Sequence, residues 1–211
     1  MQKLRVKIGL DLDNTILDYS SCFQLAAKEV LGLSLPPGAS KQDQKFFIER
    51  SLGDDVWTLL QGYAYGEFSF KAELFPHFLD FMKLAEDIKA DVLVVSHKSR
   101  YPIIGPSQDL RGFALSNLDR LGVLERLAGF PRSENSVYFC DSRDEKIERI
   151  RSMGFKLFVD DLFGVVSSIP AEVQRFHIYC AGNHETVEEV TCVTDWNSMQ
   201  RMLQVLISAD L

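Results

Sequence analysis

The sequence predicts an α/β fold in which helices cover a doubly wound parallel sheet, and three observations support this class. Short apolar runs alternate with amphipathic segments of helical period, which is the pattern of strands joined by crossover helices. The 211 residues are enough for one core domain that carries an insertion. A hydrophobic content of 46% with 25% charged residues is that of an ordinary globular chain.

The expected strands are five apolar runs rich in Val, Ile, Leu and Phe. They span residues 6–10, 91–95, 136–140, 155–159 and 175–180. The expected core helices place apolar residues at three- and four-residue spacing and span 75–90, 110–121, 144–153 and 196–207. Gly122 and Gly154 stand where two of these helices should end.

The connection from the first strand to the second is too long for a simple crossover. A crossover needs only about a dozen residues, whereas residues 11–90 lie between these two strands. We therefore expect an inserted helical module over 17–73, with the core formed by 1–16 and 74–211. Helical patterns cover 21–31 and 41–52, and Asp54-Asp55 after Gly53 is typical of a further helix start.

Charge and cysteine usage restrict the partners and the compartment. A net charge of −7 argues against a nucleic acid polymer or an anionic membrane as a general partner. The four cysteines form no CxxC pair, so we expect reduced thiols in a reducing compartment. Because the apolar N-terminal run reaches Asp11 without a cleavage site and no run is long enough to span a membrane, we expect a cytoplasmic protein. Its oligomeric state cannot be predicted.

Chemistry-bearing side chains follow several of the predicted strands. In doubly wound sheets, ligands bind beyond the carboxyl ends of the strands. The residues at or near that edge are Asp11 and Asp13 after the first strand, Ser96, His97 and Lys98 after the second, Lys146 in the helix before the fourth, and Asp160 and Asp161 after the fourth. Four carboxylates, a hydroxyl and a lysine should therefore converge on one edge of the sheet.

Each of these signals has a simpler interpretation when taken alone. An Asp-x-Asp pair is expected by chance in a chain of this composition and could be a solvated strand end. Asp160 and Asp161 could favour a helix N-terminus, and Lys98 competes with Lys146 for the role of the site lysine. Only the combination of these residues at one edge of the sheet indicates a functional site.

In this order, the residues resemble the motifs of the haloacid dehalogenase-like (HAD) superfamily of phosphohydrolases. The matching segments are Leu10-Asp11-Leu12-Asp13-Asn14-Thr15, Val95-Ser96, Lys146, and Phe158-Val159-Asp160-Asp161. The spacing from Lys146 to Asp160 fits the variants with a double aspartate. The resemblance covers the sheet domain, implies a Rossmann-like fold, and places the inserted module where this superfamily carries a helical cap.

The resemblance implies an Mg²⁺-dependent phosphatase that acts on a small phosphorylated metabolite through an aspartyl-phosphate. Asp11 would be the nucleophile and Asp13 the general acid and base. Ser96 and Lys146 would stabilise the transferring phosphoryl group. Because several carboxylates in one pocket repel each other, a hard cation is required, and Mg²⁺ suits an all-oxygen site formed by Asp11, the Asp13 backbone carbonyl, and Asp160 or Asp161.

Further candidates concern substrate binding. Thr15, His97, Lys98 and Arg100 are the expected substrate contacts, although the loop after the second strand could equally be solvated. An aromatic cluster in the inserted module either lines a pocket or packs the module; it consists of Trp57, Tyr63, Tyr65, Phe68 and Phe70.

Other functions of the same site remain open. A phosphotransferase would pass the phosphoryl group to another acceptor. A dehalogenase would not need the metal carboxylates, a receiver-type signalling module would lack the large insertion, and a non-catalytic binding protein would show no turnover.

Overall fold

The computed structural model describes residues 6–127, 136–179 and 189–209, which form two compact units. The first unit contains residues 1–16, 74–97 and 123–211, and the second contains 17–73 and 98–122. The second unit thus includes residues 98–122 in addition to the expected insertion.

The first unit is built on a six-stranded parallel sheet with strand order β5-β4-β1-β6-β7-β8. The strands are β1 (Lys7–Leu10), β4 (Asp91–His97), β5 (Val137–Cys140), β6 (Leu157–Asp160), β7 (Gln174–Ile178) and β8 (Val190–Val193). β1 lies in the middle, and successive crossovers lead away from it in both directions. The predicted doubly wound α/β class is confirmed. The end of the fifth predicted strand, at Cys180, lies outside the described residues.

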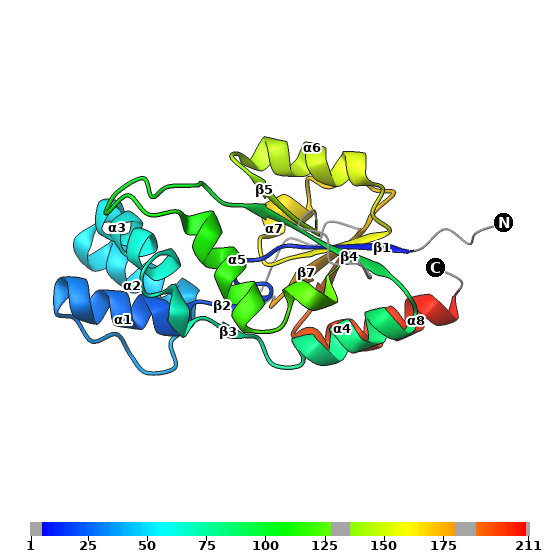
Figure 1. The fold of residues 1–211 in the computed structure, drawn as a ribbon, viewed down its shortest axis with the longest axis horizontal. Helices are drawn as coiled ribbons and strands as arrows, with labels where there is room; N and C mark the ends of the chain where they lie inside the picture. Colours follow the sequence, from blue (N-terminus) through cyan, green and yellow to red (C-terminus); the bar gives the residue numbers. More distant parts are fainter. Residues whose placement is uncertain (1–5, 128–135, 180–188, 210–211) are drawn as a thin grey trace. The chain divides into compact units, whose positions relative to one another are not determined.

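Helices cover both faces of this sheet (Figure 1). They are α4 (Phe78–Asp87), α6 (Arg143–Met153), α7 (Phe163–Val166) and α8 (Trp196–Ser208), and a short 3₁₀ helix, η2, spans Leu124–Arg126. Figure 1 shows α4 and α8 side by side on one face and α6 on the other. The predicted helices at 75–90, 144–153 and 196–207 are confirmed with shifted ends.

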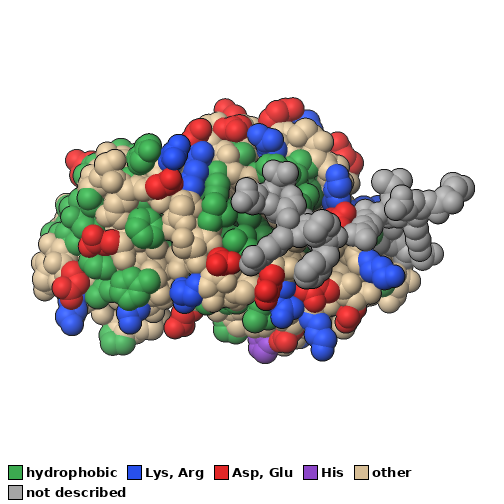
Figure 2. Space-filling view, viewed as in Figure 1, with side chains coloured by type: hydrophobic (Ala, Val, Ile, Leu, Met, Phe, Trp, Pro, Cys, Tyr) green, Lys and Arg blue, Asp and Glu red, His purple; other side chains and the backbone are tan. Residues whose placement is uncertain are grey.

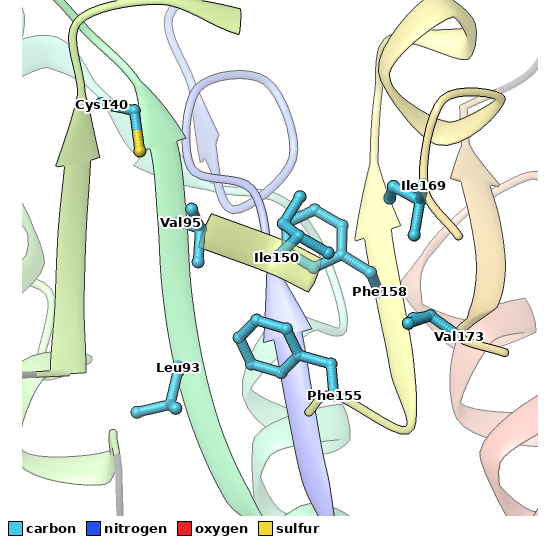
Figure 3. Close-up of a cluster of buried hydrophobic side chains, with 8 residues drawn as sticks. All are labelled: Leu93, Val95, Cys140, Ile150, Phe155, Phe158, Ile169 and Val173. Carbon is cyan, nitrogen blue, oxygen red and sulfur yellow. The ribbon is translucent and has the colours of Figure 1, made fainter. Parts of the chain in front are cut away.

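The core between α6 and the sheet is apolar and closely packed (Figure 3). It contains Leu93, Val95, Cys140, Ile150, Phe155, Phe158, Ile169 and Val173. Gly9 in β1 lies under this cluster, and a Cβ atom at that position would lie 2.3 Å from Cδ2 of Phe158. A glycine is therefore needed where the aromatic ring crosses the central strand.

The second unit is mainly helical. It contains α1 (Ser20–Leu31), α2 (Lys41–Leu52), α3 (Asp54–Tyr65), η1 (Ser69–Lys71) and α5 (Leu110–Arg120), while β2 (Leu17–Asp18) and β3 (Glu73–Leu74) form a two-stranded sheet. The predicted helices at 21–31, 41–52 and 110–121 and the helix start at Asp54 are confirmed. Ser40 begins α2 with a capping box in which its side chain and that of Asp43 bond each other's backbone N–H.

Residues 98–122 group with the second unit because α3 and α5 pack together within it. Gly62 in α3 and Gly66 just after it also let the segment that precedes α5 approach closely. A Cβ atom at Gly62 would lie 2.7 Å from the carbonyl oxygen of Ile104, and one at Gly66 would lie 2.2 Å from Oε1 of Gln108. The Arg120 side chain also donates to the carbonyl of Ala72 at 2.7 Å. The sequence pattern of α5 matches a core crossover helix, and only its packing assigns it to the second unit.

The surface carries charges of both signs. On the face shown in Figure 2, acidic and basic side chains are interspersed among apolar and neutral ones. None of the helices in the described part of the chain combines the length and apolar character that a membrane span needs.

Cys22 and Cys140 are free and buried, but Cys192 is disulfide-bonded. The expectation of reduced thiols is therefore wrong for Cys192, because pairing depends on tertiary neighbours and not on sequence spacing.

Candidate active site

The site in the first unit begins where β1 and β6 end side by side. Leu10 is in register with Val159, and the Asp11 N–H donates to the Val159 carbonyl at 2.9 Å. Asp11 and Asp160 therefore leave neighbouring strands at the same level. After Asp11 the chain turns tightly, with the N–H of Ile16 donating to the carbonyl of Leu12 at 2.9 Å.

This turn requires an unusual backbone conformation at one residue. Asn14 has a φ of 62°, in the left-handed region. Asn tolerates this region better than other residues with a Cβ, because its short polar side chain can bond locally. The turn brings Thr15 back beneath Asp11, where its hydroxyl donates to Oδ2 of the carboxylate at 3.1 Å.

Lys146 is the cation of the site. It lies on the first turns of α6, which Ser142 caps by accepting the Glu145 N–H. Its Nζ lies 2.5 Å from Oδ1 of Asp11 and 2.7 Å from Oδ2 of Asp160. Lys146 is 2% exposed and Asp160 is fully buried, so this charge network is shielded from solvent. The structure thus pairs Lys146 with Asp11.

The charge network and burial shift the pKa values of its members. Burial raises the pKa of Asp11 to about 6, against the opposing effect of the Lys146 ammonium. Burial alone would lower the pKa of Lys146, but the two carboxylates outweigh it and raise that pKa above its usual value. Lys146 therefore stays charged at neutral pH, and most Asp11 carboxyl groups are ionised.

Three carboxylates form a group that fits a hard cation. Oxygen atoms of Asp11, Asp160 and Asp161 lie within 4.8 Å of one another. Asp161 is half-buried, and the Asp160 carboxylate also accepts the Leu162 N–H at 2.9 Å, which fixes the turn into α7. An all-oxygen donor set with negative charge matches the ligands that Mg²⁺ takes in proteins, so the residues present fit this ion.

Ser96 and Asp13 complete the expected catalytic set. Ser96 lies on β4, beside β1, and is 1% exposed. Among the described residues its Oγ has no hydrogen-bond partner, which is costly for a buried hydroxyl unless a ligand supplies the partner. Asp13 is half-buried two residues beyond Asp11. Its role as acid and base stays a prediction.

The expected substrate contacts separate into different environments. Thr15 is fully buried, and its hydroxyl is already engaged by Asp11 and by the Asp161 N–H, so its geometry favours a supporting role. His97 is exposed at the end of β4. Lys98 and Arg100 belong to the second unit, and Arg100 Nε lies 3.3 Å from Oδ2 of Asp109.

Two aromatic rings of the second unit lie close to the Lys98 ammonium. It is 4% exposed, and its Nζ lies 4.0 Å from the ring centroid of Tyr65 and 5.3 Å from that of Tyr19. Trp57 stacks on Phe23 at 4.4 Å between centroids. Packing thus accounts for the buried part of the aromatic cluster. Phe70, by contrast, is 56% exposed.

Sequence reasoning did not identify the residues that support this site from the C-terminal part of the first unit. His177 Nε2 lies 3.0 Å from the carbonyl oxygen of Asp161, and Trp196 Nε1 donates to the carbonyl of Thr15 at 2.9 Å. No local pattern marks them, because each contact joins segments far apart in the chain.

The sequence matches no protein-family model and no curated protein. Solved structures, in contrast, share the fold over nearly the whole chain. A predicted phosphatase from Clostridium acetobutylicum is 13% identical with a TM-score of 0.61, covering 97% of this chain and 100% of its own. Protein SP0104 from Streptococcus pneumoniae, a haloacid dehalogenase-like family hydrolase, is 14% identical with a TM-score of 0.59, covering 98% and 99%. The chain has the fold of HAD-like hydrolases.

A third HAD-like structure was determined with magnesium bound. YfnB from Bacillus subtilis is 12% identical, with a TM-score of 0.59, and the match covers 95% of this chain and 99% of that one. At this level of identity the comparison establishes the HAD-like fold alone.

Proposed function

We propose that the protein is an Mg²⁺-dependent phosphatase that hydrolyses a small phosphorylated metabolite through an aspartyl-phosphate. The observation that carries the proposal is the buried ammonium of Lys146, which lies between the carboxylates of Asp11 and Asp160. These two carboxylates and that of Asp161 form the group that fits a hard cation. A lysine and carboxylates desolvated together at the carboxyl ends of parallel strands are suited to phosphoryl transfer, which depends mainly on positioning and charge stabilisation.

In the first step, an Asp11 carboxylate oxygen attacks phosphorus and the bond from phosphorus to the ester oxygen breaks. Asp13 donates a proton to the leaving oxygen, so that an alcohol departs and Asp11 carries the phosphoryl group. In the second step, Asp13 takes a proton from a water molecule, which attacks the same phosphorus. Inorganic phosphate leaves, and Asp11 returns as a carboxylate.

The surrounding residues hold charge and geometry during both steps. Lys146 compensates negative charge on Asp11 and on the phosphoryl oxygens, and the Ser96 hydroxyl donates to one of those oxygens. Asp11, Asp160, Asp161 and the Asp13 carbonyl are the proposed Mg²⁺ ligands. When bound, this ion would neutralise phosphate charge and orient the phosphoryl group.

The substrate-binding part of the proposal concerns the inserted module. We take the second unit to include the helical cap that the resemblance implies, and His97, Lys98 and Arg100 remain the proposed contacts to the non-reacting part of the substrate. Lys98 and Arg100 are cationic and suit an anionic group in that part of the substrate.

Phosphate release from an aryl phosphate tests the proposal. We expect turnover that requires Mg²⁺ and that is abolished in Asp11→Asn, because the amide is a poor nucleophile. Asp55→Asn is the matched control, since Asp55 is exposed at the start of α3. Absence of phosphate release from the aryl phosphate and from a broad panel of sugar phosphates, nucleotides and phospho-acids would refute the enzymatic function.

The same assay separates hydrolysis from transfer. A phosphatase releases inorganic phosphate and aryl alcohol in equal amounts, whatever acceptor alcohols are added. A phosphotransferase would release less phosphate than aryl alcohol when its acceptor is present. That second result would replace hydrolysis with group transfer while leaving the role of Asp11 intact.

A further inference from the structure

Thr15 joins the two loops that form the proposed catalytic site. Its hydroxyl donates to Oδ2 of Asp11 at 3.1 Å and accepts the N–H of Asp161 at 3.2 Å. One side chain thus links the nucleophile loop after β1 to the metal-binding loop after β6. Thr15 is fully buried, so solvent does not compete for these bonds.

The backbone of Thr15 is in turn held by donors from the C-terminal part of the first unit. The indole Nε1 of Trp196 donates to the Thr15 carbonyl at 2.9 Å, and the Tyr179 hydroxyl donates to the same oxygen at 3.4 Å. A carbonyl oxygen has two lone pairs and can accept both bonds. The shorter and fully buried bond is that of Trp196.

Trp196 is rigidly placed. It is fully buried, with its ring 5.0 Å from that of Phe78 and 4.8 Å from that of Phe81, both on α4. It is also the first residue of α8, and Asp195 caps that helix by accepting the Ser198 N–H at 2.6 Å. The indole N–H therefore has little freedom to leave its acceptor.

The loop after β6 has an additional support. His177 on β7 is 5% exposed and lies with Nε2 3.0 Å from the Asp161 carbonyl oxygen. Since that oxygen is an acceptor, Nε2 carries the hydrogen in this contact. β7 and α8 thus contact both loops of the site through side-chain donors.

We propose that Trp196 is a positioning residue, which acts through Thr15 to fix the direction of the Asp11 carboxylate relative to the metal-binding loop. This inference rests on the proposed function. Attack on phosphorus needs the reacting atoms to be aligned, and a small displacement of a catalytic group is costly in rate. The hydrogen bond of Trp196 is to the Thr15 backbone, so its proposed effect is on orientation.

The first test removes the indole donor while keeping an aromatic ring. Trp196→Phe loses the bond to Thr15 but retains most of the packing against α4. We expect kcat for an aryl phosphate to fall about tenfold with KM changed less than about twofold, because the loss affects the transition state and not ground-state binding. Tyr179→Phe should cause a smaller fall, since its bond is longer.

The matched control is Phe81→Leu, which loosens packing around the indole but leaves the donor in place. We expect it to lower the stability of the fold and to leave kcat within about twofold of wild type. If both variants lower kcat in proportion to their loss of stability, Trp196 has only a structural role and the proposal is overturned.

A second readout does not depend on turnover. Amide hydrogen exchange in the metal-free protein reports the Asp161 N–H, which is bonded to the Thr15 hydroxyl. The reference is the Lys156 N–H, which donates to the Lys7 carbonyl at 2.8 Å at the opposite end of the same strand pair. In Trp196→Phe we expect faster exchange at Asp161, about tenfold, with little change at Lys156.

The two readouts separate the failure of this inference from that of the proposed function. If wild-type protein releases no phosphate, the phosphatase proposal fails, and exchange at Asp161 alone decides whether Trp196 controls the loop. Unchanged exchange at Asp161, or equal acceleration at Asp161 and Lys156, would overturn the positioning role even in an active enzyme.

Discussion

Replacing Lys146 by methionine is the most direct test of the charge network. The Lys146 Nζ lies 2.5 Å and 2.7 Å from oxygens of Asp11 and Asp160, and the three side chains are 2%, 8% and 0% exposed. Methionine fills a similar volume without charge. The substitution therefore leaves two carboxylates buried next to each other without their shared cation.

The expected cost follows from the burial. Removing one partner of a buried ion pair destabilises a protein by about 3–5 kcal/mol. This is a large part of the roughly 5–15 kcal/mol that stabilises an ordinary domain. We therefore expect Lys146→Met to lower the free energy of unfolding by about 3–5 kcal/mol at pH 7.

The sign of the pH dependence provides a second criterion. Burial already raises the pKa of Asp11 from 3.8 to about 6, and loss of the Lys146 ammonium removes the main opposing effect. A carboxyl group whose pKa is raised in the folded state favours folding below its unfolded pKa, and that contribution is lost as the pH rises through the folded value. The deficit of the variant should thus be largest above pH 6 and shrink towards pH 4.

Urea unfolding followed by circular dichroism, at pH 7 and at pH 5, measures both quantities in metal-free protein. Lys83→Met is the control, because Lys83 is exposed on α4. A loss of less than about 1 kcal/mol at pH 7, the range of an exposed ion pair, would refute the inference that Lys146 holds a desolvated network. A deficit that grows as the pH falls would contradict the assigned charges.

Three further predictions address packing, capping and metal binding. Gly9→Ala places a methyl group 2.3 Å from the Phe158 ring, so it should cost about 1–3 kcal/mol in urea unfolding; an unchanged midpoint would contradict this close contact. Asp195→Ala removes the cap that accepts the Ser198 N–H and should cost about 1 kcal/mol, with Asp195→Asn retaining most of the stability. Activity should decrease below about pH 6 as Asp11 takes up a proton, and more Mg²⁺ should move this limb to lower pH because proton and metal compete; a limb independent of Mg²⁺ would contradict that competition.

The position of the candidate site at one edge of the sheet could be predicted from the sequence. Apolar strand patterns ended at Asp11 and Asp160, and the parallel register of Leu10 with Val159 places these aspartates on adjacent strands. The resemblance predicts Lys146 as the lysine of the site, and the structure brings its ammonium to both carboxylates. These predictions succeeded because strand ends in a parallel sheet share one edge.

Some elements were missed for physical reasons. β8 spans only Val190–Val193, and only its last residue is buried. α3 was expected only as a helix start, because its aromatic residues were interpreted as a pocket or as packing. A strand of four residues is too short for a regular period, whereas α3 does repeat buried residues at helical spacing, at Trp57, Leu60 and Ala64.

The sequence by itself determined the alternation of strands and helices, the presence of an insertion after the first strand, and which carboxylates stand at the strand ends. Local periodicity encodes these features, because burial repeats along each element. Only the tertiary structure decided that residues 98–122 pack with the insertion, that Lys146 bridges two aspartates, and that Trp196 supports Thr15. Such contacts join segments distant in the chain, and their partners are chosen by packing and by the need to satisfy buried polar groups.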